Sequence, residues 1–161
     1  MTGITIEPIR PGSPWIAPLA SSHFDYWGEL TGYNSEDAYR TFVEQAANSV
    51  SLPRVLIASD DERFLGSVNL LPGEMTSRPQ LSPWLGQLLV VPASRSCGVG
   101  AALLQAAAAY VATLGHDRLF LFTSGTLPSY YRRIGWRDVE DVFYLGKMRT
   151  IMKLELAAGT L

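Results

Sequence analysis

The apolar and polar positions along the chain change their period several times, which predicts an alternation of strands and helices. Short apolar or alternating runs between turn residues indicate strands, whereas apolar residues spaced i, i+3, i+4 and i+7 indicate helices. We therefore expect strands over residues 4–9, 54–59, 64–71, 84–91, 118–123, 136–144 and 147–156. We expect helical structure around 19–30, from Ser35 to a stop at Pro53, and over 98–114 and 127–134.

The connections between these elements predict how the strands pair. The short turn at Asp60–Glu62 joins two strands and predicts an antiparallel hairpin, and the last two strands join in the same way near Gly146. A helix stands between 84–91 and 118–123, which predicts a right-handed parallel crossover. The expected fold class is α/β: one domain over residues 1–161, with a mixed, mostly antiparallel sheet of six to seven strands and helices on both faces.

The composition narrows the classes of function. With 161 residues, 47% of them hydrophobic and 17% charged, the chain suits one folded domain. Its formal charge of −2 gives no general attraction to nucleic acid or to an anionic membrane, and no apolar stretch is long enough to cross a bilayer. The single cysteine, Cys97, cannot form an intrachain disulfide, and the N-terminus lacks a signal-peptide pattern, so we expect a cytoplasmic protein. One cysteine and two separated histidines argue against a structural zinc site, and we expect no metal.

The loop that precedes the helix over 98–114 carries the clearest chemical motif. Arg95 to Gly100 form an R-x-x-G-x-G pattern that opens directly into the helix. Glycines at 98 and 100 let the backbone approach a bulky group, and the first N–H groups of the helix attract an anion together with the helix dipole. The loop therefore predicts a ligand that carries a diphosphate.

Three segments of the chain match motifs of one known family. Residues 89–100 read L-V-V-P-x-x-R-x-x-G-x-G, as in a coenzyme A motif, and residues 130–136, YYRRIGW, are similar to an F-Y-x-x-L-G-F/W segment. The chain therefore resembles the GCN5-related N-acetyltransferase (GNAT) family. Ser82-Pro83-Trp84-Leu85 before the motif strand, together with residues 144–152, resembles one bacterial branch of that family. The resemblance covers nearly the whole chain and implies the acyl-CoA N-acyltransferase fold.

The resemblance also implies an activity. Members of the family move the acetyl group of acetyl-CoA to a primary amine by direct attack in a ternary complex. We therefore expect acetyl-CoA as co-substrate and a small-molecule amine as acceptor, such as an amino acid, a polyamine or an aminoglycoside-like compound; a protein N-terminus is a further candidate. We expect neither nucleic acid nor a membrane as a partner. The alternative, from a different class, is a non-catalytic acyl-CoA-binding sensor or regulatory module.

The resemblance places coenzyme binding in one continuous segment. The backbone of Leu89, Val90 and Val91 would hold the pantetheine arm and the thioester carbonyl. The pyrophosphate would be held by the loop and the start of the helix: Arg95, Ser96, Cys97, Gly98, Val99, Gly100 and Ala101. Ser96 and Cys97 depart from the family pattern, which often has a glycine and a basic residue there, so binding would rely mainly on backbone amides. The alternative is a purely structural turn between strand and helix.

Tyr131 is the predicted catalytic residue, because it aligns with a tyrosine that lies near the coenzyme sulfur in many relatives. A phenol has a pKa of about 10, so it stays protonated at neutral pH and can donate a proton to the departing thiolate. The alternative is that Tyr131 only packs or makes a structural hydrogen bond. The motif strand offers only Gln87 where some relatives carry a carboxylate, and an amide cannot accept the proton of the amine. We therefore expect water to relay that proton.

The acceptor site has four candidate residues: Trp27, Glu29, Glu74 and Trp84. The two acids would either attract a cationic amine or lie as solvated groups on the surface. The tryptophans would either wall a pocket or pack in the core, and for Trp84 the alternative is packing beneath the sheet.

The motif helix has no charged residue between Ser96 and Gly115. One apolar stripe is expected to face the sheet: Val99, Leu103, Ala106 or Ala107, Tyr110 and Leu114. The opposite side is small and neutral, where a solvated helix usually carries Lys or Glu. Either the C-terminal tail or a second subunit would cover it, and we predict a homodimer.

Overall fold

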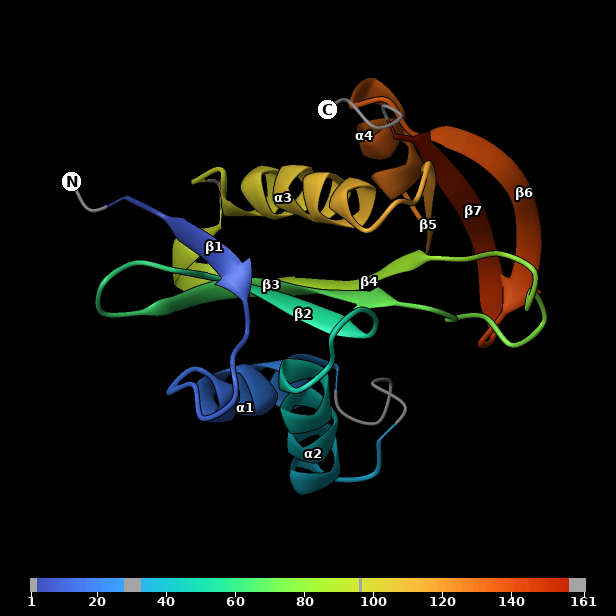
Figure 1. The fold of residues 1–161 in the computed structure, drawn as a ribbon. Helices are drawn as coiled ribbons and strands as arrows, with labels where there is room; N and C mark the ends of the chain where they lie inside the picture. Colours follow the sequence, from blue (N-terminus) through green and yellow to red (C-terminus); the bar gives the residue numbers. More distant parts are fainter. Residues whose placement is uncertain (1–2, 28–32, 96, 157–161) are drawn as a thin grey trace. The chain divides into compact units, whose positions relative to one another are not determined.

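The strands and helices of the computed structural model follow the order expected from the sequence (Figure 1). The structure describes residues 3–27, 33–95 and 97–156. The strands are β1 (Thr5–Pro8), β2 (Arg54–Ser59), β3 (Phe64–Leu71), β4 (Trp84–Val90), β5 (Arg118–Thr123), β6 (Arg137–Tyr144) and β7 (Lys147–Glu155). The α-helices are α1 (Ile16–Trp27), α2 (Glu36–Ala47), α3 (Val99–Thr113) and α4 (Leu127–Arg133), and a short 3-10 helix spans Pro92–Ser94.

Hydrogen bonds join the strands into a seven-stranded sheet in the order β1-β2-β3-β4-β5-β7-β6. β2 and β3 pair antiparallel, as do β6 and β7, in which Tyr144 lies opposite Lys147. β4 and β5 pair in parallel, with Trp84 opposite Phe120. The two predicted hairpins, the parallel pairing across the motif helix and the mostly antiparallel sheet are thus confirmed.

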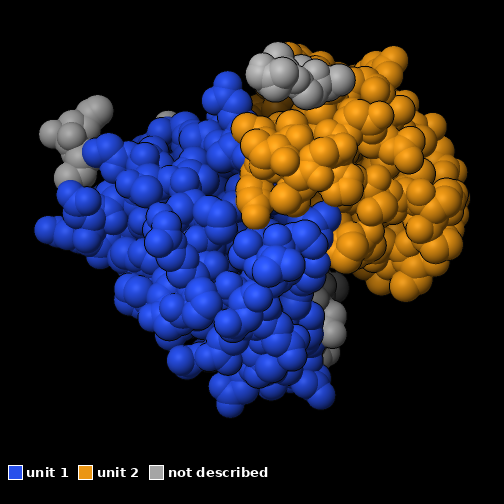
Figure 2. All heavy atoms as spheres, viewed as in Figure 1, with its two compact units in different colours: residues 1–70, 87–107 blue, residues 71–86, 108–161 orange. Residues whose placement is uncertain are grey.

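The chain forms two compact units (Figure 2). The first contains residues 1–70 and 87–107, and the second contains residues 71–86 and 108–161. β4 and α3 each run through both units. In the first unit α1 and α2 lie on one face of the sheet and α3 lies on the other (Figure 1), which confirms helices on both faces. One domain over the whole chain stays a prediction.

The start and the buried face of α2 agree with its sequence. Ser35 caps the helix, because its Oγ accepts a hydrogen bond from the N–H of Ala38 at 3.0 Å. The acids Glu36 and Asp37 stand in the first turn, where they complement the helix dipole. The residues fully buried on the inner face repeat every three or four positions: Tyr39, Val43 and Ala46.

α1 begins earlier than the sequence pattern indicated. The segment before Leu19 was expected to be irregular, but the helix begins at Ile16 and includes Pro18. Proline is tolerated in the first turn because the first N–H groups of a helix have no partner within it. His23 lies on the buried side of this helix.

α3 turns a different stripe inward from the one predicted. Its buried residues are Val99, Leu103, Leu104, Ala107 and Val111. Tyr110 and Leu114, which the prediction placed against the sheet, are only half-buried. The buried positions follow a spacing of four residues, whereas the prediction mixed spacings of three and four and so drifted off the inner face.

Each unit has its own core. In the first, α1 and α2 pack on the strands through a large cluster that includes Leu19, Tyr39, Val43, Ile57 and Leu89. In the second, Met75, Trp84, Phe120 and Ile151 form a smaller cluster. β3 and β4 approach closely in the first unit, because a Cβ on Gly66 would lie 2.4 Å from the carbonyl oxygen of Leu89.

Candidate functional site

The predicted coenzyme loop lies between the end of β4 and the start of α3, within the first unit. Gly98 has φ +83°, a conformation that side-chain-bearing residues rarely adopt, and a Cβ at that position would meet no heavy atom within 4 Å. A Cβ on Gly100 would meet Val90 Cγ2 at an ordinary 3.6 Å, so internal packing does not require a glycine there. The missing side chain leaves room in front of the loop.

The start of α3 presents unpaired backbone donors to that space. The first N–H groups of a helix, here those of Val99, Gly100 and Ala101, have no acceptor within the helix, and the dipole makes this end positive. Cys97 is exposed, and its thiol donates to the carbonyl oxygen of Arg95 at 3.6 Å. Ser96, which was also predicted to bind pyrophosphate, lies outside the described residues. This arrangement can bind an anion through backbone amides.

Arg95 is held in place by two contacts from the same unit. Its Nε donates to the carbonyl oxygen of Val90 at 3.2 Å. Its guanidinium lies over the ring of Tyr26, 5.1 Å from the ring centroid, which is within the range of a cation–π interaction. Tyr26 comes from the last turn of α1 and is 54% exposed. The pair orients the one cationic side chain of the loop.

The strand residues predicted to hold pantetheine differ in their exposure and backbone hydrogen bonds. Leu89 is buried, whereas Val90 and Val91 are half-buried. The N–H of Val91 donates to the carbonyl oxygen of Leu65 at 3.0 Å, and its own carbonyl accepts from Ser94 at 2.8 Å. Val91 therefore has no free backbone N–H for a pantetheine amide.

A buried polar array stands beside β4 in the first unit, and sequence reasoning missed most of it. The Nδ2 of Asn69 donates to Gln87 Oε1 at 2.6 Å and to the hydroxyl of Tyr39 at 3.2 Å. The ring of His23 stacks on Tyr39 with 4.1 Å between centroids, and among the described residues neither of its ring nitrogens has a hydrogen-bond partner. Burial lowers the pKa of His23 to about 4. Gln87 has φ +52°, a backbone conformation that residues with side chains rarely adopt.

Glu74 lies in the connection between β3 and β4, within the second unit. Its Oε1 is 3.1 Å from the point where a Cβ on Gly86 would stand. Burial raises the pKa of Glu74 from 4.5 to about 7. Among the described residues no hydrogen bond or ion pair of its carboxylate is found. A carboxyl group in this setting can exchange a proton near neutral pH.

Tyr131, the predicted catalytic residue, lies on α4 in the second unit and is 8% exposed. Its ring packs edge-on against Tyr130 and Trp136, with centroid distances of 5.3 and 5.9 Å. Burial, and to a smaller extent Tyr130, raises the pKa of Tyr131, so its phenol stays protonated at neutral pH. The group is therefore available as a proton donor.

The tryptophan candidates have different surroundings. Trp27 is half-buried at the end of α1, with its ring 4.6 Å from that of His23. Trp84 is completely buried, and its indole N–H donates to the carbonyl oxygen of Leu81 at 2.8 Å. Its packing against Phe120 places it in the core of the second unit, as in the alternative that Trp84 packs beneath the sheet. Glu29, the fourth candidate, lies outside the described residues.

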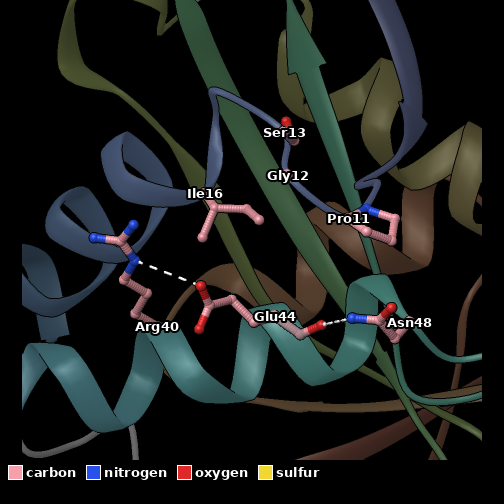
Figure 3. Close-up of a pocket in the computed structure, with 7 residues that line it drawn as sticks. All are labelled: Pro11, Gly12, Ser13, Ile16, Arg40, Glu44 and Asn48. Carbon is pink, nitrogen blue, oxygen red and sulfur yellow. Dashed lines mark hydrogen bonds and ion pairs between the residues drawn. The ribbon is translucent and has the colours of Figure 1, made fainter.

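A surface pocket of the first unit contains none of the predicted site residues (Figure 3). It has a volume of about 400 Å³ and lies between the start of α1 and the outer side of α2. Its lining residues are Pro11, Gly12, Ser13, Ile16, Arg40, Glu44 and Asn48. Arg40 and Glu44 form an ion pair with each other at 3.9 Å, so neither charge is left unbalanced for a ligand.

Within residues 3–27, 33–95 and 97–156, no group of three or more His, Cys, Asp or Glu side chains is placed to hold a metal ion. None of the helices in this described part is long and apolar enough to cross a membrane.

Comparisons with known proteins agree with the motifs. A family model described as an acetyltransferase (GNAT) domain matches residues 51–138, whereas no curated protein sequence gives a match. The solved structure of an aminoglycoside 6'-N-acetyltransferase complexed with coenzyme A aligns with a TM-score of 0.74 and 16% identity, over 95% of this chain and 97% of that one. A spermidine N-acetyltransferase chimera from Vibrio cholerae and hSSAT gives 0.72 and 16%, over 94% and 95%. A GNAT-family acetyltransferase from Streptococcus pneumoniae gives 0.67 and 14%, over 96% and 100%. At these identities the solved structures show a shared fold.

Proposed function

This chain belongs to the acetyltransferase (GNAT) family, and from that premise we propose that it transfers the acetyl group of acetyl-CoA to a primary amine of a small molecule. The observation that carries the proposal is the R-x-x-G-x-G loop at the start of α3. It lies inside the segment that the family model matches, with open space before Gly98 and no internal need for a glycine at residue 100.

Acetyl-CoA would be held by the residues around this loop. The backbone amides from Cys97 to Ala101 and the positive end of α3 suit a pyrophosphate, and the oriented guanidinium of Arg95 adds a cation. The pantetheine arm would follow β4 at Leu89 and Val90. One structural neighbour, an aminoglycoside 6'-N-acetyltransferase, is a complex with coenzyme A, which supports this choice of ligand.

The chemistry needs no covalent enzyme intermediate. The amine nitrogen attacks the thioester carbonyl, the carbon–sulfur bond breaks, and the departing thiolate takes up a proton. Tyr131 is the proposed donor of that proton, because its buried ring and raised pKa keep the phenol protonated.

A small cationic amine is the proposed acceptor. The descriptions of two structural neighbours name aminoglycoside and spermidine acetyltransferases, which act on compounds of this class. The half-buried carboxyl of Glu74 would attract an ammonium group, and Trp27 remains a candidate for the acceptor site.

A homodimer remains part of the proposal. Ala101 and Gln105 are exposed on α3 and carry no charge, so this side would suit a second subunit. Light scattering at micromolar concentration should give twice the monomer mass, and a monomer mass would contradict the dimer. The cytoplasmic location likewise stays a prediction.

The function is tested by measuring coenzyme binding and thiol release separately. Calorimetry with coenzyme A tests the loop, and release of free thiol from acetyl-CoA in the presence of spermidine, kanamycin or tyramine tests the transfer. We expect binding together with amine-dependent release. Binding without release on any amine would favour the acyl-CoA sensor, and the absence of binding would refute both functions.

A further inference from the structure

Glu74 is half-buried, and it is the one acidic residue of the described second unit whose pKa is clearly raised. It stands in the connection that leads from β3 into β4, next to Met75, which is 2% exposed in the core of this unit. Its Oε1 faces Gly86 of β4, and the side chain of Leu71 lies beside the same glycine. Neither neighbour carries a charge or a hydrogen-bonding side chain.

The other strongly interacting carboxylates of the second unit all have cationic partners. Glu140 lies 2.6 Å from Arg78, Asp138 lies 2.8 Å from Arg132, and Glu155 lies 2.8 Å from Lys153. These pairs lower the pKa of each acid. The more deeply buried Glu74 has no such pair among the described residues.

An unpaired carboxylate in a buried position destabilises the folded protein, because desolvation penalises the charged form without compensation. Such a group is therefore poorly explained by stability and is a candidate for function. An incoming ammonium would supply the partner that the protein does not. The carboxyl is not completely enclosed, so a ligand can reach it.

Gly86 leaves room for the carboxyl of Glu74 to lie against β4. A Cβ there would come within 3.1 Å of Oε1 and 3.4 Å of Leu71 Cδ1, which is tighter than ordinary contact. Gly86 is followed directly by Gln87, the residue with φ +52°, and the strand then continues into the residues proposed to hold pantetheine. Gly86 thus allows the carboxyl of Glu74, from the connection between β3 and β4, to lie against β4, a strand that contains no acidic residue.

We propose that Glu74 is the catalytic base of the acetyl transfer, binding the ammonium group of the acceptor and taking its proton. This inference rests on the proposed function and replaces the water relay expected from the sequence. Water was preferred because the motif strand offers only Gln87, but the structure brings a carboxyl to the preceding residue of that strand.

The proton balance of the step is complete. The carboxylate of Glu74 takes one proton from the ammonium, which gives a neutral amine and a neutral carboxyl. The lone pair of the amine forms the nitrogen–carbon bond, and the carbon–sulfur bond breaks with its electron pair on sulfur. The nitrogen gives its second proton to solvent as the amide forms, and the thiolate takes up a proton from Tyr131. Solvent then restores the proton of Tyr131, and Glu74 returns its own proton to solvent. One proton is released in each turnover.

The acid–base properties of Glu74 suit this role. With a pKa of about 7 in the free protein, roughly half of the group is ionised at neutral pH. The ionised form that receives the ammonium and the protonated form that follows the transfer are therefore both accessible near this pH. The same carboxyl on an exposed surface would ionise fully at that pH but would be a far weaker base.

The test compares Glu74→Gln with wild type in the thiol-release assay with spermidine, kanamycin and tyramine between pH 5.5 and 9. For each amine that wild type acetylates, we expect kcat/KM to fall about 100-fold or more in Glu74→Gln. The wild-type decrease in rate below pH 7 should also disappear. Glu74→Asp keeps a carboxyl on a shorter side chain and should restore part of the rate. Coenzyme A affinity, measured by calorimetry, should stay unchanged in both variants.

Glu62→Gln is the matched control, because Glu62 is an exposed acid in the turn between β2 and β3 and should leave the rate unchanged. Wild-type kcat/KM and pH dependence in Glu74→Gln would overturn the inference while the proposed function stands. If Glu74→Gln does not fold by circular dichroism, a wild-type rate that is independent of pH between 5.5 and 8 would overturn it instead. A wild type that releases no thiol with any of these amines would refute the proposed function, and the assignment of the base with it.

Discussion

Glu74→Gln should make the protein more stable while it removes the proposed base. The substitution keeps the size of the side chain but replaces an ionisable group with a neutral one. In wild type the folded state raises the pKa of Glu74 from 4.5 to about 7, because its carboxylate is desolvated without a partner. The folded state therefore binds more protons than the unfolded state between these pH values, and stability falls as pH rises through this window.

The difference between the two pKa values sets the size of the effect. A difference of one corresponds to about 1.4 kcal/mol, so ionised Glu74 costs up to about 3 kcal/mol above pH 7. His23 has the opposite sign. Burial lowers its pKa from 6.5 to about 4, so the unfolded state binds more protons and stability falls as pH drops through that range. Between pH 4.5 and 6.5 the two effects oppose each other, and wild type should show little change in stability from these groups.

Urea denaturation of both proteins at half-unit steps from pH 4 to 8.5 tests this reasoning. Glu74→Gln should match wild type near pH 4.5 and gain up to about 3 kcal/mol at pH 8, with a stability that rises to pH 6.5 and then levels off. Glu62→Gln serves again as the exposed control and should follow wild type throughout. If Glu74→Gln is no more stable than wild type at pH 8 and its m value is unchanged, the claim that the ionised carboxylate of Glu74 lowers the stability of the folded protein is refuted.

Three further predictions concern single side chains. Tyr26→Ala should weaken coenzyme A binding about two- to fivefold by calorimetry, because a cation–π contact at an exposed site contributes about 0.5–1 kcal/mol; an equal loss in the Arg95→Ala background would show that the two residues do not act together. Tyr131→Phe should lower kcat on the order of 100-fold or more without changing coenzyme A affinity, and an unchanged kcat across pH would remove its role as an acid. His23→Phe should keep the aromatic packing and remove two unpartnered nitrogens, so its melting temperature at pH 5 should rise above wild type; a lower value would mean that the imidazole stabilises the fold.

Local patterns were enough to predict most of the fold. The cap at Ser35 and the spacing of Tyr39, Val43 and Ala46 act within a few residues, so α2 could be placed from the sequence. The motif loop was equally readable, because Gly98 is needed for its own backbone conformation. The predicted start of α1 at about Leu19 was too late, because the helix begins at Ile16 and accepts Pro18 in its first turn.

The site depended on contacts between distant segments, which no local pattern reveals. Glu74 lies against Gly86, which is twelve positions further along the chain. The loop that carries Glu74 has no periodicity that would indicate burial. The sequence left two interpretations of Trp84, and its packing on Phe120 across the parallel pair decides for the core. Asn69 carried no signal either, because its role comes from the side chain of Gln87 on the neighbouring strand.

His23 and Glu74 differ in what the fold requires of them. His23 is neutral at physiological pH, because its lowered pKa removes the charge, and it needs no partner there beyond its aromatic neighbours. Glu74 is half-ionised at pH 7, so the fold carries an unpaired negative charge that an ammonium ligand would neutralise. A bound ammonium should therefore lower the pKa of Glu74, which makes acceptor binding release a proton from the neutral form of the carboxyl. Acceptor binding and deprotonation of Glu74 would then be linked. The lower stability of the free protein would follow from leaving this carboxyl without a charged partner until the acceptor binds.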